Sequence, residues 1–348
     1  MIFFVMFVII IFPISVFADS AKSSIVMDLD SGRVVYQKNM NQKRLIASTT
    51  KIMTAIVAIE NGNLTKKVKV GEEILSMYGT NIYVEVGESM KLKDLLYGLL
   101  LRSGNDASVV IAKAVAGSEE NFVKMMNDKA KEIGMKNTTF KNPHGLDEKT
   151  ENYSTAYDMA KLSRYAYQNK TYRNITSTSK YEVSTGKKTY LWYNRNKLLT
   201  DYEDCTGGKN GYTPRAGKTL VSTASKNGLN LTAVTLSDGD IYTNHKNLYE
   251  MIFSKYQRYK IVDKNHFAID KEFVDYDVYL KNSFYYPLSK DEIDDIKTVV
   301  YFFDDVTSDK VGKIKIYLAD EEIGEVLIYG KEKKKDDLSF FEWLKNLF

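Results

Sequence analysis

A serine and a lysine three residues apart stand just ahead of a strongly apolar segment, and this arrangement constrains the fold more than any other feature of the chain. The residues read Ser48-Thr49-Thr50-Lys51, and the stretch 52–60 that follows is rich in Ile, Ala and Val. Residues three apart share one face of a helix. The pattern therefore predicts a buried helix with a hydroxyl and an amine at its N-terminus, where the helix dipole favours an oxyanion. A simple N-cap role for Ser48 is the alternative.

Two further motifs follow in order along the chain. Ser103-Gly104-Asn105 comes after the apolar helical run 95–101, and Lys209-Asn210-Gly211 opens a segment that predicts two strands joined at Asn227-Gly228. Each triplet is common by itself. The ordered set Ser-x-x-Lys, Ser-x-Asn and Lys-x-Gly is the motif set of class A β-lactamases and penicillin-binding proteins.

The chain resembles the low-molecular-mass penicillin-binding proteins, the D-alanyl-D-alanine carboxypeptidases, from about Ile25 to Tyr259. Beyond the three motifs, the matching stretches are Asn-Pro-His-Gly-Leu-Asp at 142–147, the segment 154–160, Asn-Arg-Asn at 194–196, and 208–213 with 216–217. Asn210 is a departure, because the family usually has Thr or Ser there. Its side-chain amide carries two N–H groups and can replace the hydroxyl as a donor.

The resemblance implies an acyl-enzyme mechanism with no metal or other cofactor. Ser48 would attack the D-alanyl-D-alanine bond of a peptidoglycan stem peptide, and β-lactams would capture the same hydroxyl covalently. Lys51 would be the base, provided that burial beside a second cation such as Lys209 lowers its pKa enough to make the amine neutral. Ser103 would relay the proton to the leaving amine, and Asn105 would hold Lys51 and the substrate backbone.

The third motif and an arginine ahead of it are expected to bind the substrate. Lys209 and Arg195 would hold the terminal carboxylate, which an exopeptidase must recognise, although a surface ion pair is the alternative for Arg195. The N–H groups of Ser48 and Tyr212 would stabilise the tetrahedral oxyanion. His144 is expected to be structural, since the family has it near the site without a base role. The predicted substrate-binding residues are Lys209, Asn210, Gly211, Tyr212, Thr213 and Arg195.

The composition argues against several other classes of protein. A net charge of +4 in 348 residues is too small to indicate a partner nucleic acid, although it suits an anionic wall or membrane surface. The 3 histidines form no His-Glu-x-x-His pattern, so no metal site is expected. Cys205 is the only cysteine, so no intrachain disulfide can form, and we expect a buried structural thiol.

The order of apolar patterns predicts an α+β fold. Alternating residues over 24–37 and 181–236 indicate strands, whereas helical patterns dominate between them and return at 242–256. We expect an antiparallel sheet with a flanking helical cluster, β-lactamase/transpeptidase-like, in a penicillin-binding D,D-peptidase domain over 19–259. Short aromatic and β-branched runs predict a small all-β sandwich domain over 260–330. The alternative is that these strands continue the first domain.

Both ends of the chain carry membrane-related patterns. Residues 1–18 have no charged side chain and end in Ala18, which predicts a cleaved secretory signal peptide and action at the extracytoplasmic face of the membrane or in the cell wall. An uncleaved anchor is the alternative. Residues 331–348 combine a basic cluster with an amphipathic pattern, which predicts a helix lying in the membrane surface. Packing of this helix against its own domain is the alternative.

Two other functions share part of this pattern. A β-lactamase needs a placed glutamate, but segment 148–152 lacks the leucine of the Glu-x-x-Leu-Asn pattern. A non-catalytic peptidoglycan-binding relative is favoured only by Asn210, because the other motif residues are intact. The sequence therefore favours a serine D,D-carboxypeptidase that penicillin inhibits.

Overall fold

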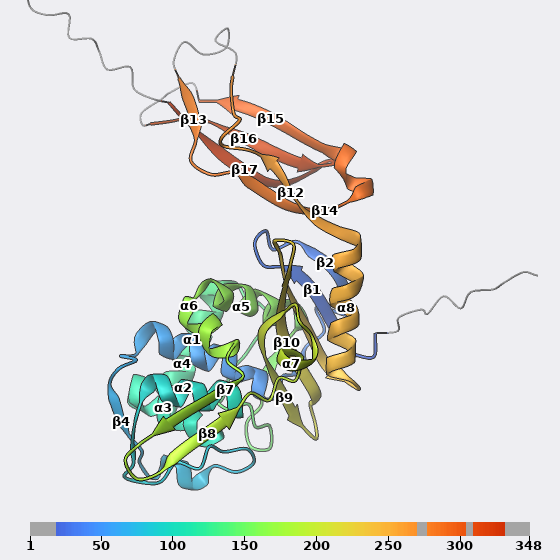
Figure 1. Cartoon of the computed structure of the whole chain (residues 1–348). Helices are drawn as coiled ribbons and strands as arrows, with labels where there is room; N and C mark the ends of the chain where they lie inside the picture. The colour runs from blue at the N-terminus through green and yellow to red at the C-terminus, as the bar shows by residue number, and fades with distance from the viewer. Residues whose placement is uncertain (1–18, 270–276, 304–308, 331–348) are drawn as a thin grey trace, which may run out of the picture.

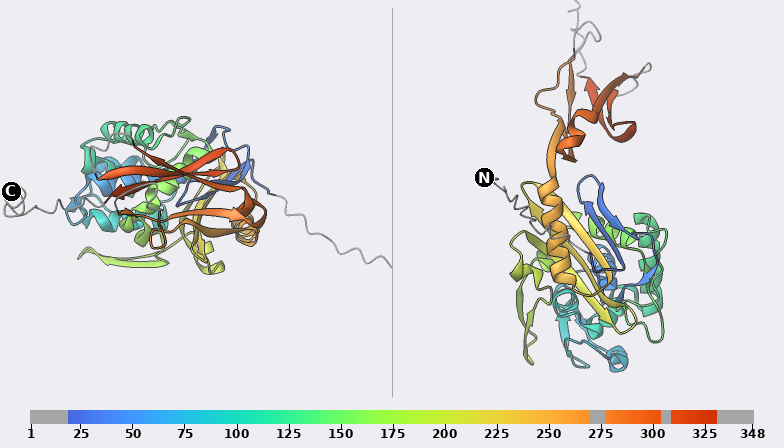
Figure 2. Two further views of the ribbon diagram at one scale, coloured as in Figure 1. Left: turned by 90° about the horizontal axis from the view of Figure 1, so that it is seen from above. Right: turned by 90° about the vertical axis from the view of Figure 1, so that its right-hand side faces the viewer.

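The computed structural model describes residues 19–269, 277–303 and 309–330. They form a larger α+β body and a smaller all-β body, joined where helix α8 (Ile241–Lys255) continues directly into strand β12 (Tyr256–Val262) (Figure 1). The expected domain boundary at 259–260 falls inside β12, because this strand already belongs to the smaller body. The expected signal segment and C-terminal tail lie outside the described residues. Figure 2 shows α8 from the side, running along the larger body towards the smaller one.

An antiparallel sheet of five strands forms the centre of the larger body, in the order β2-β1-β11-β10-β9. Its strands are β1 (Ser23–Asp28), β2 (Val34–Lys38), β9 (Cys205–Thr213), β10 (Gly217–Lys226) and β11 (Leu229–Asp238). The predicted hairpin at Asn227-Gly228 is confirmed, and both residues have the positive φ angles, 52° and 79°, that a two-residue turn favours. Because β1 pairs with β11, the two ends of this body meet in one sheet.

Helices cover both faces of this sheet because its central strands are apolar on both sides. Neighbouring residues of a strand point to opposite faces. Leu220 of β10 packs in a core with Leu248 and Tyr249 of α8, whereas Val221 belongs to the core shared with the helical cluster. The sheet therefore lies between α8 and the cluster.

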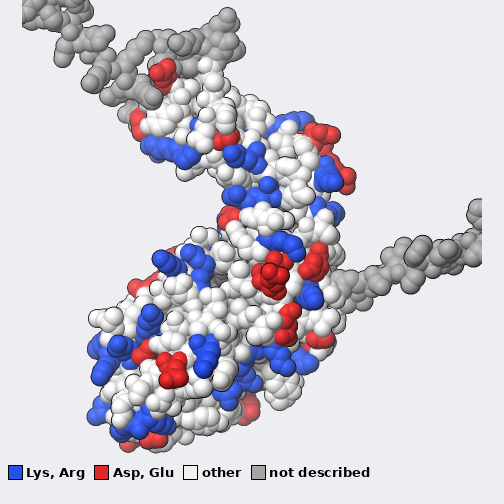
Figure 3. Space-filling model, in the orientation of Figure 1, with Lys and Arg blue, Asp and Glu red and all other residues white. Residues whose placement is uncertain are grey.

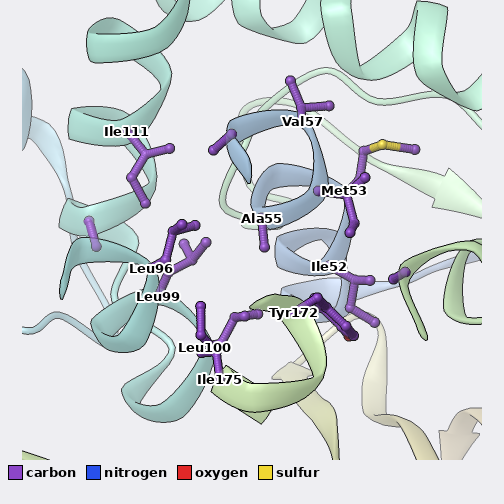
Figure 4. Close-up of a cluster of buried hydrophobic side chains, with 14 of the residues drawn as sticks. Ile52, Met53, Ala55, Val57, Leu96, Leu99, Leu100, Ile111, Tyr172 and Ile175 are labelled. Carbon is purple, nitrogen blue, oxygen red and sulfur yellow. The ribbon is translucent and has the colours of Figure 1, made fainter. Parts of the chain in front are cut away.

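The helical cluster surrounds helix α1 (Lys51–Asn61), in which every residue from Lys51 to Ala58 is buried. Figure 4 shows Ile52 and Ala55 of α1 facing Leu96, Tyr172 and Ile175 from neighbouring helices. The other helices are α2 (Leu92–Tyr97), α3 (Asn105–Ala116), α4 (Glu119–Ile133), α5 (Ala156–Gln168), α6 (Lys170–Thr176) and α7 (Leu198–Asp201). Short 3-10 turns η1 (Ala47–Thr50) and η2 (Glu72–Ser76) and the π-helical turn η3 (Gly98–Arg102) connect them.

Three short strand pairs complete the larger body. They are β3 (Arg44–Leu45) with β6 (Tyr153–Ser154), β4 (Lys67–Lys69) with β5 (Ser89–Lys91), and β7 (Lys180–Ser184) with β8 (Thr189–Tyr193). The last pair is a hairpin that lies over the helical cluster, on the side of β9 (Figure 1).

The smaller body is a sandwich of two antiparallel sheets, as the sequence predicted. Strand β12 pairs with β14 (Phe284–Ser289), and a second sheet has the order β13-β17-β16-β15. Among the described residues, none of these strands joins the five-stranded sheet, so the smaller body is no continuation of it. The strands of the second sheet are β13 (Val278–Leu280), β15 (Ile296–Phe302), β16 (Lys310–Leu318) and β17 (Glu321–Gly330), with the 3-10 turn η4 (Lys290–Asp295) ahead of β15.

Arg33, beside the turn between β1 and β2, ties the two bodies together. Its guanidinium donates to the Pro287 carbonyl at 2.5 Å and to the Glu292 carboxylate, and it lies over the rings of Tyr256 and Tyr286. Cation–π contacts of this kind strengthen when they are shielded from water. Figure 3 shows basic and acidic side chains interspersed over this face of both bodies. Within the described part of the chain, none of the helices has the length and apolar character needed to span a bilayer.

Candidate active site

Lys51 lies at the point where the sheet meets the helical cluster, and its amine is fully buried. It is the first residue of α1, immediately after the 3-10 turn η1 that carries Ser48. Lys51 Nζ donates to Ser48 Oγ at 3.0 Å, to Asn105 Oδ1 at 2.7 Å and to the His144 carbonyl at 2.5 Å. The hydroxyl and the amine are therefore within hydrogen-bonding reach, as the three-residue spacing predicted.

Burial prepares this amine to accept a proton. It lowers the pKa of Lys51 to about 7, the cation of Arg195 acts in the same direction, and the Asp106 carboxylate opposes both. Near neutral pH, a substantial fraction of the amine is then uncharged. The sequence predicted this burial beside a second cation such as Lys209. Lys209 is also fully buried and its pKa is lowered by the charge of Lys51, and Arg195 is a further cation that lowers the pKa of both lysines.

The second motif supplies the partner that orients the Lys51 amine. Asn105 begins helix α3, and its Nδ2 donates to the Tyr78 carbonyl at 2.7 Å, which leaves Oδ1 to accept from Lys51. Ser103 is buried and has a φ of 69°, in the left-handed region that residues with a Cβ rarely adopt. Such strain in a polar residue is often found at functional sites.

The third motif lies on β9, which is the edge strand of the five-stranded sheet. Lys209 is fully buried, burial lowers its pKa well below the usual value, and the charges of Lys51 and Arg195 add to this. A Cβ on Gly211 would lie 2.7 Å from the backbone nitrogen of Ser48. Only glycine lets β9 pass this close to the Ser48 turn. Asn210 is half-buried and Tyr212 is 65% exposed, so their side chains point to the face of the strand opposite to the buried side chain of Lys209.

The other two predicted binding residues have partners in the protein. Arg195 donates through Nη1 to Thr80 Oγ1 at 3.0 Å, and it forms no ion pair among the described residues. The Thr213 hydroxyl is buried and donates to Asp147 Oδ2 at 2.6 Å, so it braces the loop 142–147 against β9. Arg195 is also near enough to Lys51 and Lys209 for its charge to lower the pKa of both. The Thr213 hydroxyl is instead held by Asp147.

The loop 142–147 holds a backbone carbonyl against the Lys51 amine. The Asn142 Oδ1 atom accepts hydrogen bonds from the N–H groups of His144 and Gly145, at 3.2 and 2.6 Å, and this fixes the His144 carbonyl against Lys51. Burial lowers the pKa of the His144 ring to about 3, so the ring is neutral. The role of this histidine near Lys51 is carried by its backbone, in keeping with the structural role expected for it.

Sequence reasoning missed two residues that shape the site. Asp106 is buried and accepts from the N–H groups of Ile82 and Tyr83 at 2.9 and 2.7 Å, which holds their loop beside Asn105. Asn152 Nδ2 donates to Thr50 Oγ1 at 3.0 Å and so links the loop after Asp147 to the Ser48 turn. An acidic residue in the first turn of α3 was the available signal for Asp106, and nothing in the local pattern marked Asn152.

Neither glutamate of segment 148–152 meets the need of a β-lactamase. Glu151 pairs with Arg215, and Glu148 is exposed; neither bonds to Ser48 or Lys51 among the described residues. The thiol of Cys205 is half-buried, and burial raises its pKa to about 11. No cluster of three or more His, Cys, Asp or Glu side chains suited to a metal ion occurs in the part of the chain that the structure describes.

A hydroxyl and a buried amine at the junction of an antiparallel sheet and a helical cluster are the arrangement of the active-serine acyl-transferring hydrolases. A sequence model of the D-alanyl-D-alanine carboxypeptidases matches residues 14–240. The chain belongs to this family of serine peptidases, as its motifs predicted.

Individual relatives agree with this assignment. Over 261 residues the chain is 40% identical to the D-alanyl-D-alanine carboxypeptidase DacF of Bacillus subtilis, covering 71% of this chain and 66% of that relative. It is 35% identical over 228 residues to DacC of Escherichia coli, covering 62% of this chain and 56% of that one, so it spans less than two thirds of either. The crystal structure of DacD from Francisella tularensis matches with a TM-score of 0.71 at 27% identity, over 94% of this chain and 96% of that chain. The structural likeness extends over both bodies.

Proposed function

We propose that this chain is a serine-type D-alanyl-D-alanine carboxypeptidase that removes the terminal D-alanine of peptidoglycan stem peptides and is inhibited by penicillin. The observation that carries the proposal is the Lys51 amine, buried, with a pKa of about 7, and 3.0 Å from Ser48 Oγ. A hydroxyl is a poor nucleophile until a base takes its proton, and an amine in this state can do so at neutral pH.

In the proposed reaction, Ser48 Oγ attacks the carbonyl carbon of the penultimate D-alanine while its proton moves to Lys51 Nζ. The N–H groups of Ser48 and Tyr212 stabilise the oxyanion. The C–N bond then breaks, Ser103 passes the proton to the departing amine, and free D-alanine leaves. Asn105 keeps Lys51 in place through the 2.7 Å bond. Water hydrolyses the acyl-enzyme and regenerates the serine.

We propose that the terminal carboxylate of the substrate binds beside Lys209 and Arg195. The charge of Lys51 lowers the pKa of Lys209, and the charge of Arg195 lowers the pKa of both lysines, so the Arg195 guanidinium carries the permanent positive charge that an arriving carboxylate would meet. Charge-assisted hydrogen bonds to a carboxylate are stronger than neutral ones. Gly211 and Asn210 would line the path of the peptide along the free edge of β9, and Thr213 would act by holding that edge in position.

Mass spectrometry after incubation with penicillin tests the function. We expect a stable adduct on Ser48, formed at a rate that rises with pH and levels off above about 7, because only the deprotonated Lys51 amine is a base. D-alanine release from a D-alanyl-D-alanine peptide should follow the same profile. An adduct that is lost rapidly would indicate a β-lactamase, and the absence of any adduct would indicate a non-catalytic relative.

Asn210 is expected to assist substrate binding more than catalysis. Asn210→Ala should raise KM for a D-alanyl-D-alanine peptide by the equivalent of about 1 to 3 kcal/mol, the value of a hydrogen bond to a charged group, with kcat nearly unchanged. Asn210→Thr is the matched control and should retain activity. A KM for Asn210→Ala equal to that of the unsubstituted enzyme would show that this side chain does not touch the substrate.

We propose further that the chain is exported by the segment 1–18 and held at the extracytoplasmic membrane surface by residues 331–348. The apolar arc of the tail, which includes Phe341 and Trp343, stands next to a run of lysines that favours anionic lipid. Deleting 338–348 should release the enzyme from vesicles containing anionic lipid while D-alanine release from a soluble peptide is retained. Continued sedimentation of the truncated mature chain with vesicles would assign the anchor to another segment.

A further inference from the structure

Strand β15 presents an apolar edge that nothing covers in the described structure. Val299, Val300 and Tyr301 are 40%, 43% and 43% exposed, and Phe303 just beyond the strand is 37% exposed. The strand is the last in the order β13-β17-β16-β15, so among the described residues no strand lies against its outer edge (Figure 1). Natural edge strands usually carry charges or prolines that block pairing with another chain. In β15 the only charged residue is Lys297.

The opposite sheet is too narrow to cover this strand. Val300 pairs with Ile314 of β16, and paired residues share one face of a sheet, so Val300 is on the face that holds the core. The buried core residues come from β12, β13, β16 and β17, and the covering sheet has 2 strands against 4. Val300 therefore remains exposed although it points to the core side, and Val299 and Tyr301 are exposed on the opposite face of the strand.

We propose that β15 is an interface between two copies of this chain, in which the two β15 strands pair antiparallel about a two-fold axis through Val299. A two-fold axis perpendicular to the sheet keeps each face of the strand on the same side in both copies, so paired residues must point to the same face. This is possible only if the axis passes through one residue, which then lies opposite its own counterpart in the second copy. Val299 is the midpoint of Ile296–Phe302, so this register pairs the whole strand. The two four-stranded sheets then form one continuous sheet.

The register is self-complementary, which favours a second copy over another occupant. Lys297 lies opposite Tyr301 of the second copy, where an ammonium and an aromatic ring attract, and no like charges face each other. Thr298 lies opposite Val300, a β-branched pair of the kind that stabilises sheets. A lipid surface or a foreign strand would not require this symmetry. Because seven residues of edge are small beside the roughly 1,600 Å² of a standard interface, the dimer is expected to be weak and concentration-dependent.

Cysteine cross-linking of the mature chain tests the register. Directly opposed Cα atoms in an antiparallel pair lie at disulfide distance, so Val299→Cys should give a covalent dimer under mild oxidation. Thr298→Cys alone should not, whereas a mixture of Thr298→Cys and Val300→Cys should. Leu191→Cys, on β8 and also 43% exposed, is the matched control for random collisions. Equal cross-linking of Val299→Cys and Leu191→Cys, or none with either, would overturn the proposal.

Sedimentation velocity gives an independent measurement. The unsubstituted chain should shift from monomer to dimer as its concentration rises, and Val300→Lys should keep it monomeric with D-alanine release intact. A chain that is monomeric at its highest soluble concentration contradicts the interface, and so does a dimer that Val300→Lys leaves unchanged. Loss of vesicle binding in Val300→Lys without any change in mass would assign the edge to lipid instead. The cross-linking and sedimentation results do not depend on the peptidase activity, so the interface and the proposed function fail separately.

Discussion

Lys51→Ala is expected to lower the rate of Ser48 acylation by penicillin on the order of a hundredfold to ten-thousandfold, the usual contribution of a general base. The amine is held by Ser48 Oγ, Asn105 Oδ1 and the His144 carbonyl, so it has no substitute in this geometry. Ser48→Ala should abolish labelling altogether, because it removes the nucleophile. Stopped-flow or mass-spectrometric measurement of acylation gives the rates, and unfolding temperatures confirm that the variants are folded.

Two controls separate the base from the charge. Lys51→Arg keeps a cation but cannot lose its proton in a protein, so it should be as slow as Lys51→Ala if deprotonation is what matters. Lys113→Ala removes a lysine from the ion pair with Glu73 on the surface of α3 and should acylate normally. If Lys51→Ala were acylated by penicillin at the normal rate, Lys51 would not be the base. If Lys51→Arg were acylated at the normal rate, Lys51 would act through its positive charge.

Local sequence patterns predicted those elements whose cause is itself local. The Asn227-Gly228 hairpin follows from two residues that tolerate positive φ, and α8 follows from the amphipathic pattern of 242–256. The predicted domain boundary at 259–260 falls inside β12, because α8 runs straight into this strand without a turn residue that could mark a change. The family resemblance brought the three motifs together, which no local pattern does.

The rest of the site depends on contacts between residues far apart in the chain. Asn105 meets Lys51 across 54 positions, and Asn152 meets Thr50 across 102, so neither bond leaves a periodic trace in the sequence. The exposure of a side chain is equally difficult to predict from the local sequence. The alternating residues of β15 predict a strand, but only the width of the opposite sheet decides that Val300 stays open. The arginine that joins the two bodies, Arg33, looks in the sequence like any charged residue beside a turn.

Gly145→Ala is expected to damage the site as severely as the loss of Lys51, although Gly145 has no functional group. Its φ is +87°, and a Cβ there would lie 2.0 Å from the Ala47 carbonyl oxygen and 3.0 Å from the Ser48 nitrogen. The left-handed conformation alone costs a residue with a Cβ about 1 to 2 kcal/mol. The clash is additional, and it can be relieved only by moving the Ser48 turn or the loop that holds the His144 carbonyl against Lys51.

Gly117→Ala separates the two costs, because Gly117 has a φ of +80° with nothing within 4 Å of the added Cβ. It should lose about 1 to 2 kcal/mol of stability and acylate at the normal rate. Gly145→Ala should lose more stability and also acylate slowly, since any shift of the backbone displaces Ser48 Oγ from Lys51 Nζ and misplaced reacting groups cost large factors in rate. Thermal unfolding and penicillin acylation measure both effects. If Gly145→Ala matched Gly117→Ala in both measurements, the loop 142–147 would not be what positions the nucleophile, and the bond from Asn152 to Thr50 would have to hold the turn without it.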